Sequence, residues 1–340
     1  MLTVSTDHVN KIADNFNWYK KMLFKRNLYY LCKSRSSIDL LSLPKIDAEI
    51  LNQEYYTKAN FNNGLLYKTS GTSNGTRKNI YYSDFDHKQY IIQRKCIFSK
   101  YLKGQYKVAC SDLGTGHAAD SATEIFNALG LTAYQIQFSD PTEKHIEILN
   151  KTLPDVFFTM PMILKKLINS NELRIQPKII FLVGDLVTKS WLNEISNYFG
   201  IEKSNIIDLF GSIEIGSIAS FNHDLDAYIF EDHIMPEIDD ENVMVLTSTA
   251  RTYFPAIRYH TGDVISNLEQ VKFNGRKVWT FKKFLGRQGL DLKVGEKISY
   301  HDIVNCIDKI IPNLPFKLVE SNHSIEIIVP DHIDDNCQDP

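Results

Sequence analysis

A loop rich in glycine and hydroxyl residues, followed by two cations, is the first stretch of the sequence that could do chemistry. It lies within YKTSGTSNGTRKNIYY, residues 67–82. It is not a Walker loop, because only three residues separate Gly71 from Gly75 and because Lys78 is followed by Asn79. The flanking residues favour a strand–loop–strand unit. Such a loop could hold a polyphosphate through backbone, hydroxyl and cationic groups, although an ordinary hairpin turn has a similar composition.

The elements that would position this loop include a regular alternation of strands and helices from residue 106 to residue 210. Short runs rich in β-formers alternate with segments of helical period, which predicts a parallel sheet with helical crossovers. These runs are YKVAC, LTAYQIQF, DVFFT, KIIFLV and NIIDLF. Two of the helical segments end at Gly130 and Gly200, residues suited to a left-handed cap. Ligands of such sheets bind beyond the carboxyl ends of the strands, where this chain reads SDLGTGH, VGD and FGSIE.

The regions on either side of this alternation have a different texture. Residues 1–60 favour helices and contain no chemical motif, whereas the chain after about residue 240 favours antiparallel strands, with a hairpin turn at Asn274 and Gly275. Glycines at 286, 289 and 295 suggest a hinge. We therefore predict a domain over 1–285, a hinge over 286–293 and a small C-terminal subdomain over 294–340.

The composition is typical of a globular protein. Of 340 residues, 43% are hydrophobic and 23% are charged, and the net charge of −3 argues against a nucleic-acid surface. Five scattered cysteines form no CxxC pair, which favours a reduced compartment over a disulfide framework or a zinc site. The N-terminus does not read as a signal peptide and no run is long enough to span a membrane. We expect a cytoplasmic protein that has neither a membrane nor a nucleic acid as partner.

Four motifs, in order, carry a resemblance to a known family. They are TSGTSNGTRK, FGSIEIG, RYHTGD and LGRQGLDLKVGEKI. In this order they resemble the adenylate-forming superfamily, which comprises acyl-CoA synthetases, peptide-synthetase adenylation domains and luciferases. PAIRYHTGDVI, with VLTST upstream, is most similar to the phenylacetate-CoA ligase branch. The resemblance covers about residues 65–298. It implies an α/β fold: a large N-terminal domain with parallel sheets flanked by helices plus an antiparallel β region, and a strongly shortened C-terminal cap.

The resemblance also implies a role for particular residues. It places Phe210 against adenine, Asp263 on the ribose hydroxyls and Glu214 on Mg²⁺. The full set of residues implied to bind ATP is Thr69, Ser70, Gly71, Thr72, Ser73, Gly75, Thr76, Lys78, Gly184, Asp185, Phe210, Gly211, Ser212, Asp263 and Arg287. Asp112, His117 and Gly184 are candidates for binding the acid substrate, and Lys293 and Arg287 for catalysis. Taken singly, each of these residues could have a structural role alone. Phe210 could pack in a core, Asp263 could stabilise a turn, and His117 could be a histidine whose hydrogen bonds are made within the protein.

The activity implied is ATP-dependent activation of a small carboxylic acid in the presence of Mg²⁺. The acid would attack the α-phosphorus, giving an acyl-adenylate and pyrophosphate. The acyl group would then pass to the thiol of coenzyme A or of a carrier protein, or to an amine, as in a biosynthetic ligase. Three departures from the family pattern stand out: Ile213 where Thr or Ser is usual, Gly289 and Leu290 in the hinge motif, and the short C-terminal region. The alternative is a catalytically silent nucleotide-binding or scaffold protein of the same fold.

Overall fold

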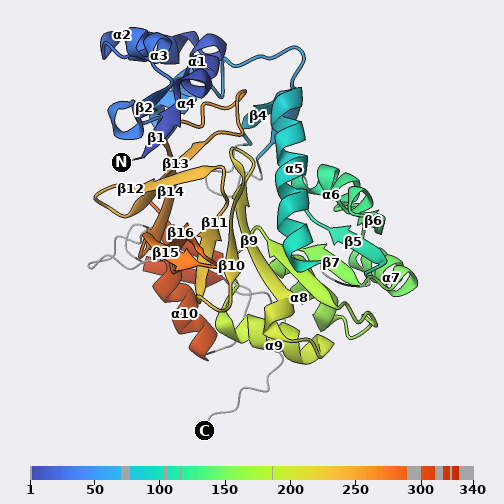
Figure 1. Cartoon of the computed structure of the whole chain (residues 1–340). Helices are drawn as coiled ribbons and strands as arrows, with labels where there is room; N and C mark the ends of the chain where they lie inside the picture. Colours follow the sequence, from blue (N-terminus) through green and yellow to red (C-terminus); the bar gives the residue numbers. More distant parts are fainter. Residues whose placement is uncertain are drawn as a thin grey trace.

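A nine-stranded mixed sheet lies at the centre of the computed structural model (Figure 1), which describes residues 2–69, 77–102, 104, 106–114, 117–185, 187–288, 300–310, 317–321 and 324–328. The strand order is β15-β16-β11-β10-β9-β8-β7-β5-β6. The parallel strands are β5 (Val108–Asp112), β6 (Thr132–Ile136), β7 (Val156–Thr159), β8 (Ile179–Val183) and β9 (Ile206–Ser212). The antiparallel strands are β10 (Gly216–Asn222), β11 (Ala227–Phe230), β15 (Glu269–Phe273) and β16 (Arg276–Phe281). The parallel strands fall in the five predicted runs, so that prediction is confirmed.

Helices cover both faces of the parallel part of this sheet. α5 (Asp84–Tyr101) and α6 (His117–Ala128) share one apolar cluster with Phe158 and Phe181, whereas Phe157 and Ile180 pack with helices α7 (Thr142–Thr152), α8 (Pro161–Asn169) and α9 (Lys189–Phe199). Neighbouring residues of one strand point to opposite faces, so continuous apolar runs such as IIFLV are required here. α9 ends at the left-handed cap Gly200 (φ 64°), as predicted, and the short 3₁₀ turn η2 (Lys203–Asn205) leads into β9.

The glycine-rich loop joins two antiparallel strands, β3 (Leu65–Lys68) and β4 (Asn79–Tyr82). The predicted strand–loop–strand unit is therefore confirmed, although residues 70–76 lie outside the described residues. β4 leads directly into α5, whose first turn is closed by a reciprocal capping box between Ser83 and Asp86. The strand that follows the loop is thus joined to the long helix that crosses the sheet (Figure 1).

A second, four-stranded antiparallel sheet has the order β12-β13-β14-β17. Its strands are β12 (Ile234–Ile238), β13 (Val243–Ser248), β14 (Tyr259–Ser266) and β17 (Lys283–Arg287). The chain after residue 240 is antiparallel as expected, and the β15–β16 hairpin turns at Asn274 and Gly275, both with positive φ (48° and 80°). Positive φ at both turn residues matches the type I′ turn that this dipeptide favours.

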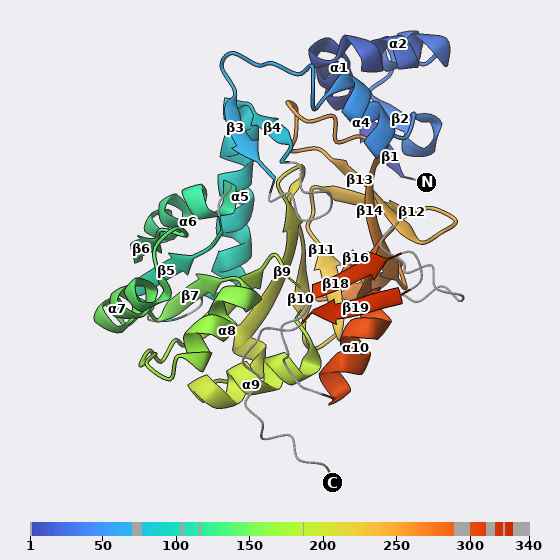
Figure 2. The same cartoon turned by 180° about the vertical axis from the view of Figure 1, so that it is seen from behind.

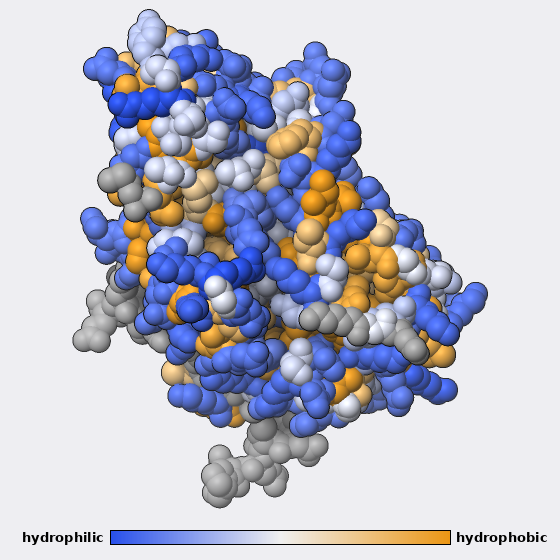
Figure 3. Space-filling view, in the orientation of Figure 1, coloured by the Kyte–Doolittle hydropathy of each residue, from blue (hydrophilic) through white to orange (hydrophobic). Residues whose placement is uncertain are grey.

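The N-terminal layer packs beside this second sheet and is mostly helical, as predicted (Figures 1 and 2). It comprises β1 (Thr3–Ser5), α1 (Thr6–Asn15), α2 (Asn17–Lys25), α3 (Tyr29–Ser34), β2 (Ser37–Asp39), the 3₁₀ turn η1 (Leu40–Ser42) and α4 (Ala48–Glu54). A backbone bridge between Ile46 and Tyr259 joins the layer to β14. On the face shown in Figure 3, hydrophilic residues cover much of this layer, whereas hydrophobic ones gather over α5 and α6.

The C-terminal region is small: α10 (Tyr300–Ile310) packs beside β17 and is followed by the hairpin β18 (Lys317–Ser321) and β19 (Ser324–Ile328) (Figure 2). The first residues of the predicted hinge, Gly286 and Arg287, belong to β17, and 289–293 lie outside the described residues. The domain boundaries therefore remain predictions. No helix among the described ranges is both long and apolar enough to cross a membrane.

A buried ion pair ties these parts together. Arg251, 1% exposed, donates from Nη1 to Asp86 Oδ2 at 2.9 Å, from Nη2 to the carbonyl of Tyr81 at 3.0 Å, and from Nε to the carbonyl of Glu214 at 2.8 Å. Its guanidinium carbon lies 3.4 Å from the centre of the Tyr82 ring. One side chain therefore holds β4, the first turn of α5 and the turn after β9 in fixed relative positions.

Replacing Arg251 with Met is expected to lower the free energy of unfolding by about 3–5 kcal/mol, because it leaves the Asp86 carboxylate buried beside an apolar side chain. Urea denaturation measures the loss. The matched control is Arg276→Met, which removes an exposed pair with Asp232 and is expected to cost less than about 1 kcal/mol. Equal losses in the two variants would contradict the structural role given to Arg251.

Candidate functional site

The clearest contact among the predicted site residues joins Asp263 on β14 to Arg287 on β17. The two residues are directly opposed in the sheet, and Arg287 Nε donates to Asp263 Oδ1 at 2.8 Å. Burial raises the pKa of the Asp263 carboxyl, while the Arg287 charge pulls it back down. In turn, Asp263 raises the pKa of Arg287, which is therefore fully charged. The structure thus places a buried carboxylate on β14 directly beside a cation on β17.

Glu214 lies in the turn between β9 and β10, and three neighbouring groups fix the backbone of that turn. Tyr82 donates its hydroxyl to the Ile213 carbonyl at 2.7 Å, Ser212 Oγ accepts from the backbone N–H of Ile215 at 3.2 Å, and Arg251 holds the Glu214 carbonyl. The Glu214 charge also contributes to raising the pKa of Asp263. Glu214 and Asp263 are therefore close enough to interact electrostatically.

Tyr56, just after α4, connects the glycine-rich loop to this group, and sequence reasoning missed it. Lys78 Nζ lies 4.4 Å from the centre of the Tyr56 ring, and Tyr259 on β14 is near enough to Tyr56 to influence its pKa. Burial raises the pKa of Tyr56, with a further contribution from Glu214. The cation that follows the loop, the carboxylate after β9 and the β14 strand thus meet around one phenol. No motif marks Tyr56 in the sequence.

A second group of residues lies at the carboxyl ends of β8 and β9. Gly184 follows β8 with a φ of 101°, and a Cβ there would lie 3.0 Å from the Met160 methyl group, so both backbone and space favour glycine. Burial raises the pKa of Asp185. Phe210, half-buried on β9, has ring contacts at 5.8 Å with Phe281 and with Phe284 on β17. β9 therefore approaches the strand that carries Arg287.

Asp208 is a site candidate that sequence reasoning missed. It stands two residues before Phe210 on β9, on the same face of the strand, and is half-buried like Phe210 while its strand neighbours are buried. It accepts a short hydrogen bond from the hydroxyl of Tyr228. Burial raises the pKa of Asp208 to about 7, and the charge of Asp185 adds to the effect. An acidic residue inside the apolar run NIIDLF was the signal that could have revealed it.

Other predicted residues have mainly structural contacts. Thr69 closes the neck of the loop, because its backbone and Oγ1 both bond to Lys78 at 3.0 Å. A Cβ on Gly211 would lie 2.6 Å from the Gly216 carbonyl oxygen, so the close approach of β10 requires glycine. The remaining predicted residues, Ser70, Gly71, Thr72, Ser73, Gly75, Thr76 and Lys293, lie outside the described residues.

Asp112, which was expected to bind the substrate, forms a buried contact with α7, and its contact with substrate remains a prediction. Asp112 is 0% exposed, and its Oδ2 accepts from His145 Nδ1 at 2.8 Å. Asp112 lies at the end of β5, as the sequence predicted, but its side chain points toward α7. Burial there raises the pKa of Asp112. Strand position alone does not tell which face the last residue takes.

His117, the first residue of α6, is 3% exposed and lies among the rings of Tyr67, Tyr82 and Tyr90. Its Nε2 lies 3.1 Å from His87 Nδ1, and its buried Nδ1 has no hydrogen-bond partner within the described part of the chain. Burial lowers the pKa of His117 to about 2, so the ring is neutral. The histidine packs against Tyr67 on β3 and Tyr82 on β4 and so supports this hairpin. Its contact with substrate remains a prediction.

Glu214 is the residue expected to hold a metal at this site. The described residues contain no cluster of three or more His, Cys, Asp or Glu side chains that could hold an ion. Mg²⁺ commonly binds through one or two carboxylates together with substrate phosphates, so a single Glu214 fits a metal that arrives with a nucleotide. Bound there, Mg²⁺ would neutralise phosphate charge.

The raised pKa of Asp208 predicts a pH-dependent stability. The folded chain holds this proton up to about pH 7, whereas the unfolded chain releases it near pH 4, so ionisation makes the fold less stable as the pH rises between those values. Asp208→Asn removes this ionisation and is expected to gain stability over the parent protein between pH 5 and pH 7.5. Urea midpoints across this range measure the gain. The exposed control Asp224→Asn should show a constant difference, and a constant difference for Asp208→Asn as well would contradict the assignment.

The chain is similar to a curated ligase along nearly its whole length. Fumarate–(S)-2,3-diaminopropanoate ligase of Enterobacter agglomerans is 42% identical over 334 residues, which cover 94% of this chain and 83% of that protein. No protein-family model matches the chain.

Solved structures of the same fold are adenylate-forming ligases. A 2-hydroxyisobutyryl-CoA ligase in its postadenylation state aligns with a TM-score of 0.75 over 95% of this chain and 76% of its own, at 13% identity. ATP-bound MatB from Rhodopseudomonas palustris aligns with a TM-score of 0.54 over 78% of this chain and 56% of its own, at 15% identity. The curated relative and this shared fold confirm the superfamily read from the sequence, whereas the phenylacetate-CoA ligase branch and the roles of the motif residues remain predictions. The chain belongs to the adenylate-forming superfamily of ligases.

Proposed function

We propose that this protein activates a small carboxylic acid with ATP and transfers the resulting acyl group to an amine. Acid activation is supported by the convergence of four separate stretches of chain. They contribute Asp263, Arg287, Glu214 and Lys78. The amine is favoured over a thiol as acceptor because the relative at 42% identity is named for joining fumarate to an amino acid that has two amino groups. Coenzyme A and a carrier protein are the competing acceptors, and the 2-hydroxyisobutyryl-CoA ligase, also solved with coenzyme A, supports that choice less directly.

The chemistry has two steps in which atoms and charge balance. A carboxylate oxygen of the acid attacks the α-phosphorus of ATP, a new P–O bond forms, and pyrophosphate leaves with the electrons of the broken bond. The amine nitrogen then attacks the acyl carbon, AMP leaves, and the nitrogen loses a proton. Neither step requires a nucleophile from the protein, so positioning and charge neutralisation are what the site must supply.

The residues of the site suit these tasks. Lys78 offers positive charge near the loop that would face the phosphates, and Glu214 would hold Mg²⁺ beside them. The Asp263 carboxylate can accept hydrogen bonds from two neighbouring ribose hydroxyls, and charged acceptors make such bonds about twice as strong as neutral ones. Phe210 would stack on adenine, and Asp208 on the same face can accept a hydrogen bond from an exocyclic amine. Gly184 and Asp185 would lie beside the base and the acid.

One departure from the family pattern, Ile213, lies in a turn that other contacts hold in place. Ile213 lacks a hydroxyl, but its carbonyl is fixed by Tyr82, and the neighbouring Ser212 Oγ holds the turn. The described C-terminal region keeps one helix and one hairpin, and Lys309 on α10 is exposed. Because the relatives are ligases, the alternative of a silent scaffold protein is the weaker one.

The first test is exchange of labelled pyrophosphate into ATP, which reports acyl-adenylate formation alone. With fumarate as the acid, the parent protein is expected to catalyse exchange, and Asp263→Ala should lower the rate about 100-fold or more, since two charge-assisted hydrogen bonds of about 1.5–3 kcal/mol each are lost. Asp232→Ala, at an exposed carboxylate, is the matched control and should retain the parental rate. A folded protein that binds ATP yet shows no exchange with a broad panel of acids would favour the silent scaffold.

The second test concerns the acceptor. Fumarate and ATP are combined with (S)-2,3-diaminopropanoate or with coenzyme A, and the products are identified by mass spectrometry. We expect an amide and AMP in the first mixture and no thioester in the second, with AMP release increased by the amine. Formation of the thioester alone would overturn the amine assignment while leaving acid activation intact.

A further inference from the structure

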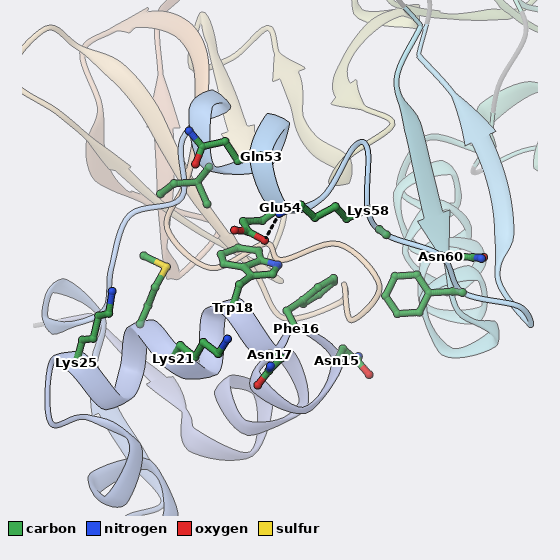
Figure 4. Close-up of a pocket in the computed structure, with 14 residues that line it drawn as sticks. Asn15, Phe16, Asn17, Trp18, Lys21, Lys25, Gln53, Glu54, Lys58 and Asn60 are labelled. Atoms are coloured by element: carbon green, nitrogen blue, oxygen red, sulfur yellow. Dashed lines mark hydrogen bonds and ion pairs between the residues drawn. The ribbon is translucent and has the colours of Figure 1, made fainter.

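The N-terminal layer contains a cavity of about 590 Å³ between α2 and α4 (Figure 4). None of the predicted site residues lines this cavity, so it is separate from the group of residues around Asp263. Its volume lies within the range of small-molecule sites, which is about 300–1,000 Å³. It therefore needs an explanation that acid activation does not supply.

The charged side chains around the cavity are mostly cationic. Three lysines and one glutamate line it, namely Lys21, Lys25, Lys58 and Glu54. Glu54 is already paired with Lys58, at 3.0 Å. Lys21 and Lys25 stand one helical turn apart on α2 and, within the described part of the chain, neither forms an ion pair; the sequence between Asp14 and Asp39 contains no acidic residue. Like charges at this spacing destabilise a helix by a few tenths of a kcal/mol, and an anion between them would reverse the sign.

The helix dipole explains only one of these two cations. Lys25 is in the last turn of α2, where a positive charge is favourable. Lys21 stands one turn earlier and gains little from the dipole. A bound anion would account for both lysines, because both line the same cavity.

An aromatic surface lies beside these cations. Figure 4 shows the Trp18 ring in the middle of the cavity, next to the Glu54–Lys58 pair. Phe16 and Phe61 also line the cavity, and their rings pack edge to face at 5.8 Å from each other. The buried indole Nε1 of Trp18 has no hydrogen-bond partner among the described residues.

We propose that this cavity binds a small organic anion, a flat aromatic ring that carries a carboxylate or a phosphate. The ring lies against Trp18, and the anionic group lies between Lys21 and Lys25. Amide side chains on the cavity wall, from Asn17 and Gln53, supply further hydrogen bonds. The carboxylate that lines this cavity, Glu54, is already paired with Lys58, and none of the residues expected to bind ATP lines it, so the proposed role is binding without a reaction.

The test uses the full-length protein without ATP or acid, so its outcome is independent of the proposed function. Phenyl phosphate is titrated into the protein and followed by calorimetry, with benzoate and inorganic phosphate as separate arms. We expect saturable binding of phenyl phosphate or benzoate, and the tighter of the two identifies the anionic group. Binding of inorganic phosphate should be at least tenfold weaker. If inorganic phosphate bound as tightly as the aromatic probes, the ring site on Trp18 would be wrong.

Variants locate the binding. Lys21→Gln/Lys25→Gln is expected to raise the dissociation constant at least about tenfold, since two charged hydrogen bonds are lost. The matched control Lys272→Gln/Lys277→Gln removes the same charge from the exposed β15–β16 hairpin and should leave the constant unchanged. Trp18→Phe should weaken the aromatic probes but not inorganic phosphate. Absence of saturable binding, or equal effects of the two lysine pairs, would overturn the proposal.

Discussion

The buried pair of Arg251 and Asp86 is the interaction on which the arrangement of the site depends. A charge removed from water is stable only when it is paired and hydrogen-bonded, and this pair meets both conditions. Asp86 accepts from the backbone of Thr252 and Tyr253 as well as from Arg251, and Arg251 also holds two backbone carbonyls. Because such bonds are directional, the start of α5, the end of β4 and the turn that carries Glu214 are held in one geometry. Neither ion is part of the proposed chemistry, yet both position it.

Near this pair, the described structure contains three acidic residues whose charged forms are disfavoured. Asp263, Asp185 and Asp208 all have raised pKa values because burial disfavours their charged forms, and Arg287 pairs with Asp263. Hydroxyls, an amine group or a metal would relieve this cost by providing donors or positive charge. A nucleotide with Mg²⁺ offers all three. The burial that disfavours these charged carboxylates is therefore what would make the site selective for such a ligand.

The sequence predicted those parts of the fold that depend on local pattern. The five parallel strands, the β3–β4 hairpin and the turn at Asn274–Gly275 follow from periodicity, β-propensity and turn chemistry, which act over a few residues. Motif order supplied the family. Tyr56 and Arg251 could not be found in this way, because their roles arise from contacts with residues up to about 170 positions away along the chain. The sequence also did not indicate which face of the sheet Asp112 occupies, since only its partner His145 reveals that face.

The central claim is that four separate stretches of chain form one nucleotide site. The most direct measurement is a crystal structure of the protein with Mg²⁺ and a non-hydrolysable ATP analogue. The account predicts the base against Phe210, the ribose hydroxyls on Asp263, the metal on Glu214 and the phosphates beside Lys78. An analogue bound elsewhere, with these four side chains contacting none of it, would contradict the account.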